Sequence, residues 1–127
     1  MKKTLVALCV GLAVVVAASA VVRAEQKVKL TGYLVDVMCA SGHMKNHPQD
    51  ADAFAASHTK SCGLEEGCAA SGYGIVSGGK WYPFDAKGNE MAKALFEKSK
   101  KENHIGATVE GVQNGDQIAV EKLTESE

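Results

Sequence analysis

The chain has 127 residues, with 14 lysines and arginines against 15 acidic residues, and a net charge of −1 at neutral pH. A chain of this length has room for one domain with one modest hydrophobic core. Its nearly balanced charge, without clustered basic residues, argues against nucleic acid or anionic lipid as a partner, because these ligands select clustered positive charge.

The first 24 residues have the order of a secretory signal peptide. Two lysines near the N-terminus precede an apolar run over residues 5–18, and small residues follow that run. Cleavage after Ala20 or Ala24 would leave an exported single domain, residues 25–127, in the periplasm or outside the cell, with no stable membrane span. The alternative is an uncleaved anchor, because the apolar stretch approaches the roughly 20 residues that cross a bilayer.

The first three predicted elements of the domain are strands. Apolar and polar residues alternate over residues 27–37, and Gly32 is expected at a bulge that bends this strand. Residues 73–77 and 80–84 flank Gly78-Gly79, which predicts two strands joined by a tight turn.

A helix and two further strands complete the predicted domain. Residues 89–101 pair their apolar side chains at a spacing of four and end in lysines, which is typical of an amphipathic helix, here with Asn89 as its N-cap. Residues 105–112 and 117–123 are rich in β-branched side chains and flank Asn114-Gly115, a strong hairpin signal.

The predicted order is three strands, one helix and two strands. This is the order of an OB-type barrel of five strands, in which the helix lies between the third and fourth strands. We therefore expect a mainly β fold with one helix, of the α+β class, built as a small OB-like five-stranded barrel. Its first connection, residues 39–70, is expected to be a loop insertion rich in cysteine and histidine.

The predicted domain carries three cysteines, an odd number for a compartment that oxidises thiols. Cys39 and His43 are four residues apart and would share one face of a helix. Together with Cys62 and Cys68 they would supply three thiolates and one imidazole, a known closed ligand set for zinc. A metal site made of these four residues is the first hypothesis.

Other side chains near these cysteines are candidates for further ligands or for supporting contacts. Asp36 could orient a ligating histidine through the other ring nitrogen, or cap the end of the first strand. His47 and His58 could serve as alternative ligands. Met38 and Met44 add soft sulfur, so copper(I) competes with zinc for the predicted site.

The competing hypothesis is a disulfide. A bridge from Cys39 to Cys62 or Cys68 would pin the insertion to the barrel and stabilise the fold by roughly 2 to 4 kcal/mol. The chain would then be a structural or interaction domain of the cell envelope that contacts a protein partner without metal or catalysis. We expect no enzyme in either case, because no oxyanion-hole motif, phosphate loop or C-x-x-C redox motif accompanies Cys39 and His43.

Four sequence segments carry a resemblance. They are G-Y-L-V-D-x-x-C-x-x-x-H at 32–43, C-x5-C-A-A-S-G-Y-G-I-V at 62–76, G-K-W-Y at 79–82 and T-V-E-G at 108–111. Together they resemble a group of small exported bacterial proteins of unknown function, with an OB-like β domain and a later cysteine pair. The resemblance implies no established activity, and it picks out the residues Asp36, Cys39, His43, Cys62 and Cys68.

Overall fold

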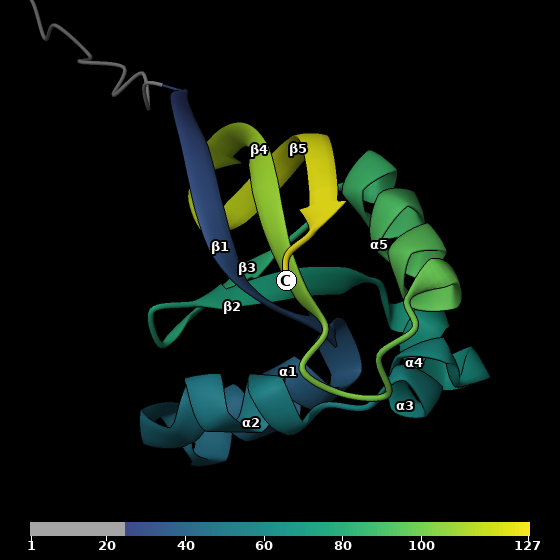
Figure 1. Ribbon diagram of the computed structural model, residues 1–127. Coiled ribbons are helices and arrows are strands. Elements are labelled where there is room, and N and C mark those ends of the chain that lie inside the picture. The colour runs from purple at the N-terminus through teal and green to yellow at the C-terminus, as the bar shows by residue number, and fades with distance from the viewer. Residues whose placement is uncertain (1–24) are drawn as a thin grey trace, which may run out of the picture.

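The computed structural model describes residues 25–127 (Figure 1), so the expected signal peptide at residues 1–24 lies outside the described part of the chain. Within this part, no helix is both long enough and apolar enough to cross a membrane.

Five antiparallel strands form one sheet in the order β3-β2-β1-β4-β5. The strands are β1 (Gln26–Asp36), β2 (Tyr73–Ser77), β3 (Lys80–Pro83), β4 (Gly106–Asn114) and β5 (Gln117–Glu125). The five predicted strands and the α+β class are confirmed. The ladder does not close, and a single isolated parallel bridge, from Phe84 to Ile118, links the region of edge strand β3 to edge strand β5.

The prediction of a single helix is wrong, because the described residues form five α-helices and one short 3-10 turn. These elements are α1 (Val37–Asn46), the turn η1 (Pro48–Asp50), α2 (Ala51–Ser57), α3 (Lys60–Leu64), α4 (Glu66–Ser71) and α5 (Ala86–Lys98). The region expected to be a loop is therefore a set of four short helices. In Figure 1 these four helices gather at one end of the sheet, and α5 lies beside β5.

Two hydrophobic clusters hold the helices to the sheet. The larger cluster joins the strands to α5 through fully buried residues such as Leu34, Ile118 and Phe96. The smaller cluster packs α1 and α2 against β1 and β2 through Val35 and its neighbours. Successive residues of a strand point to opposite faces, so the end of β1 supplies both clusters and leads directly into the cysteine-bearing helices.

The N-cap of helix α5 is Asp85 instead of Asn89, four residues earlier than predicted. The Asp85 side chain accepts the backbone N–H of Gly88 at 2.9 Å, which is the ordinary capping contact. The Asn89 side chain instead accepts the backbone N–H of Tyr73 at 2.8 Å and so joins α5 to the start of β2.

The bulge predicted at Gly32 is also wrong, because the pairing of β1 with β4 continues in register through this residue. The register shift lies between Glu110 and Gly111, where β4 pairs with β5. Gly32 is needed for a different reason. A Cβ atom at this position would run into the backbone carbonyl of Val76 and would lie 3.1 Å from the Cα of Ser77.

We expect Gly32→Ala to lower the free energy of unfolding by about 1 to 3 kcal/mol, because backbone atoms of β2 would have to move. The matched control is Gly42→Ala in α1, where an added Cβ meets nothing within 4 Å. This control should stabilise the helix by up to about 1 kcal/mol. Urea unfolding of both variants checks the prediction, and equal stabilities would contradict it.

Candidate metal centre

The three cysteines of the described domain occupy equivalent positions in three helices. Cys39, Cys62 and Cys68 are each the third residue of a helix, in α1, α3 and α4 respectively. The N-cap side chains of the first two helices accept the backbone N–H of the cysteine, Asp36 from Cys39 at 2.8 Å and Thr59 from Cys62 at 3.2 Å. These caps fix the first turn of each helix and therefore the position of its thiol.

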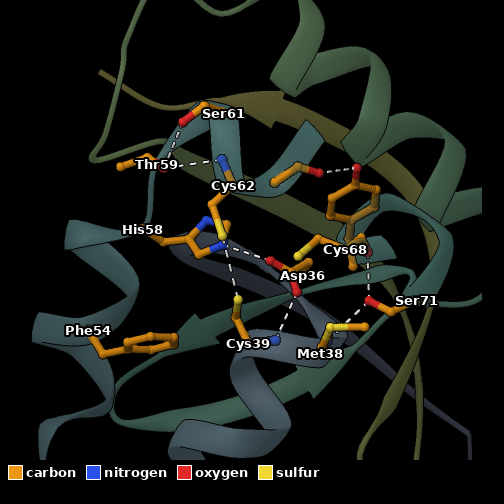
Figure 2. Close-up of polar contacts among 12 residues, drawn as sticks. Asp36, Met38, Cys39, Phe54, His58, Thr59, Ser61, Cys62, Cys68 and Ser71 are labelled. Atoms are coloured by element: carbon orange, nitrogen blue, oxygen red, sulfur yellow. Dashed lines mark hydrogen bonds and ion pairs between the residues drawn. The ribbon is translucent and has the colours of Figure 1, made fainter. Parts of the chain in front are cut away.

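The side chains of Asp36, Cys39, Cys62 and Cys68 converge on one point (Figure 2). One donor atom from each lies within 4.8 Å of the other three, and each of the four side chains is buried or half-buried. All three cysteines are free thiols. The structure thus brings together the three predicted cysteines with a carboxylate.

The sulfur spacing matches that of a metal site better than that of a disulfide. The Sγ atoms of Cys39 and Cys62 are 3.6 Å apart. A disulfide bond measures about 2.05 Å, whereas two thiolates on a tetrahedral zinc ion, each about 2.3 Å from it, lie about 3.8 Å apart. A small adjustment of these side chains would accommodate the ion.

Asp36 is fully buried and makes hydrogen bonds with both carboxylate oxygens. Oδ1 accepts the backbone N–H of Cys39, so Asp36, which was expected to cap the end of the first strand, is the N-cap of the helix that follows it. Oδ2 lies 2.7 Å from Nε2 of His58, a side chain that is itself almost fully buried. His58 therefore supports the carboxylate of the site, and its other nitrogen, Nδ1, is buried without a hydrogen-bond partner.

The surroundings of these groups shift their pKa values in opposite directions. Burial tends to raise the pKa of Asp36, but the hydrogen bonds from His58 and from the backbone of Cys39 outweigh it and hold this pKa below its usual value. Burial, contact with Cys62 and the negative charge of Asp36 raise the pKa of Cys39. Burial, followed by the charge of Asp36, raises the pKa of Cys68 to about 11. The thiols of Cys39 and Cys68 are therefore neutral near pH 7 in the metal-free protein, and a metal ion must displace their protons.

His43 and His47 lie outside this group of four donors. The ring of His43 stacks on Phe54 of α2 with a centroid distance of 3.9 Å and an interplanar angle of 5°. His47 follows the last residue of α1 and is exposed. The reason is helix geometry, because Cys39 belongs to the first turn of α1, at the end of β1, whereas His43 belongs to the next turn, which packs on α2.

The sequence contains a signal for this arrangement that the spacing of cysteines and histidines does not reveal. The three cysteines stand in the segments D-V-M-C, T-K-S-C and E-E-G-C. The first residue is a preferred N-cap in the first two segments, Asp36 and Thr59, but not in the third. The third of these caps, Glu65, makes no side-chain capping bond, but α4 still begins after it. The Asp and Thr caps therefore predict two of the three helix starts, each with a thiol in its first turn.

Comparison of the chain with protein-family models, with curated proteins and with solved structures finds no match. The function is therefore inferred from the geometry of the site.

In metal-free, reduced protein we expect the thiol of Cys68 to titrate near pH 11 and the thiol of Cys39 well above its usual range. Asp36→Asn should lower both values because it removes a nearby negative charge. Alkylation rates measured against pH, with the thiols resolved by peptide mapping, check this prediction. Asp52→Asn, at an exposed carboxylate, is the control and should change neither value. A thiol pKa several units below 8.5 that is lost in His43→Ala would contradict the prediction and indicate a catalytic cysteine.

Proposed function

We propose that this chain is a small exported binding module that holds Zn²⁺ through Cys39, Cys62, Cys68 and Asp36. The observation that carries the proposal is the convergence of these four donor atoms within 4.8 Å of one another. They come from three helices and from the end of β1. Segments separated by up to 32 positions in the sequence would not bring three thiols and a carboxylate together by local geometry alone.

The donor set favours zinc as the resident ion. Three thiolates and one carboxylate oxygen make four ligands of the types that zinc accepts in tetrahedral sites. Copper(I) is the second candidate, because thiolates are soft ligands, but the oxygen of Asp36 is a hard donor that suits zinc better. The thioether of Met38 gives copper little further support, since this side chain is 57% exposed.

The ion would act as a structural element and not as a catalyst. Four protein ligands complete a tetrahedral zinc site, whereas catalytic zinc keeps an open position for water or substrate. Binding would join α1, α3 and α4 to the end of β1 at one point, and its free energy would add to the stability of the fold. This supports the expectation that the chain is a binding module without enzyme activity.

The remaining parts of the proposal concern location and architecture. Export is supported by the signal-like order of residues 1–24 and by the resemblance to small exported bacterial proteins. The OB-like architecture is supported by the strand order β3-β2-β1-β4-β5 and by the parallel bridge from Phe84 to Ile118, which is where a barrel of this type would close.

A disulfide-stapled envelope domain, which contacts a protein partner, is the second candidate function. It is favoured by the 3.6 Å distance between the Sγ atoms of Cys39 and Cys62, which would need only a short approach to bond. In that form Cys68, which is buried, would remain as a free thiol.

Native mass spectrometry of the protein purified from the periplasm distinguishes the two functions. We expect one tightly bound zinc ion that is released by a strong chelator under mild acid. A metal-free mass that is lower than that of the reduced chain by two hydrogen atoms would contradict the zinc site and support the disulfide.

Variants identify the ligands. We expect Cys39→Ser and Cys62→Ser to lower zinc affinity by more than about 100-fold, since loss of even an outer-shell contact costs about 10- to 100-fold. His43→Ala is the control and should keep the tightly bound ion, because the His43 ring packs on Phe54 and lies outside the group of four donors. Competition between a zinc indicator dye and each variant measures these affinities, and loss of the tight ion in His43→Ala would overturn the assignment of Asp36 as the fourth ligand.

A further inference from the structure

Two histidines at the C-terminal end of α1 play no part in the cysteine site. His43 lies in the last turn of α1, and His47 follows the last helical residue. The backbone N–H of His47 donates to the carbonyl of His43 at 2.7 Å, so the helical turn is complete between the two residues. His47 leaves the helix at φ −139° and ψ 54°, yet its ring lies beside that of His43. Two histidines four residues apart are also a known zinc-binding arrangement in helices.

One ring nitrogen of His43 has no hydrogen-bond partner. This atom, Nε2, is buried. Buried polar atoms are nearly always paired, and an unpaired one calls for an explanation such as an ion or a water molecule. The stacking of the His43 ring on Phe54 holds that ring in a fixed plane. Binding of an ion would therefore cost little side-chain conformational entropy at His43.

The spacing of the two rings fits a chelate. Their centroids are 5.6 Å apart, and the ring planes are inclined by 42°. With zinc–nitrogen bonds of about 2.0 to 2.1 Å, two imidazoles that bind one ion at an angle of about 110 to 120° have centroids about 5.2 to 5.5 Å apart. The observed centroid distance of 5.6 Å is slightly longer than this range, and the exposed side chain of His47 can move to shorten it.

We infer that His43 and His47 form a second cation site, for a divalent ion of borderline softness such as Zn²⁺, separate from the cysteine site. Two imidazoles are fewer protein ligands than a closed set of four, so this site binds its ion more weakly than the cysteine site. Neutral imidazole nitrogen suits Zn²⁺ and Cu²⁺ and disfavours Mg²⁺ and Ca²⁺, which select oxygen ligands. The site does not depend on the cysteine site, because its donors are different residues.

Titration of the reduced, full domain with Zn²⁺ tests the inference, with the imidazole nitrogens followed by ¹⁵N NMR and the stoichiometry by calorimetry. We expect a second, weaker equivalent that shifts the signals of His43 and His47 together. His47→Gln should weaken this equivalent by at least about 10-fold, the smallest effect expected for loss of a ligand, and leave the first equivalent unchanged. His104→Gln, at another exposed histidine, is the matched control and should change neither equivalent.

The outcomes separate this inference from the proposed function. Shifts of His43 and His47 with the first equivalent that persist in Cys39→Ser would mean that the histidine pair binds while the cysteine site does not. If Cys39→Ser abolishes these shifts, His43 belongs to the cysteine site and the inference is overturned. Saturation without any change at these imidazoles, or a second equivalent that is unaffected by His47→Gln, would overturn the inference. Because His47 is exposed, its substitution tests the pair without disturbing the packing of His43 on Phe54.

Discussion

The arrangement of the cysteine-bearing helices depends on one buried carboxylate. Asp36 is the last residue of β1 and the N-cap of α1, and its second oxygen is bonded to His58, which follows the end of α2. An ionised group with no exposed surface is costly unless it is fully hydrogen-bonded, and removal of one partner from such a pair costs several kcal/mol. The two contacts of Asp36 therefore fix where the sheet ends and where the first thiol lies.

The strands could be predicted because their signals are local. Alternation of apolar residues, the Gly78-Gly79 turn and the Asn114-Gly115 turn each mark an element without help from the rest of the chain. The helices between β1 and β2 could not be predicted in this way. They are short and rich in small residues, and helices of this length are stabilised by caps and by packing on the sheet rather than by their own sequence.

The candidate site was predictable in its cysteines and not in its fourth donor. Three cysteines near the two ends of one insertion were expected to meet, and they do. Whether His43 or Asp36 is the fourth donor depends on which side chain lies near the end of β1, where the cysteines meet. The number of residues between His43 and Cys39 does not give this. Asp36 was expected as a possible further ligand, as an orienting residue or as a cap, and the structure places one of its oxygens among the converging donors.

X-ray absorption at the zinc edge, on protein loaded with one equivalent of zinc, tests the central claim most directly. The site described above predicts three sulfur neighbours at about 2.3 Å and one oxygen neighbour at about 2.0 to 2.2 Å, without the outer-shell scattering of an imidazole ring. A first shell dominated by nitrogen and oxygen, or a clear imidazole contribution with fewer than three sulfurs, would contradict a centre made of Asp36, Cys39, Cys62 and Cys68.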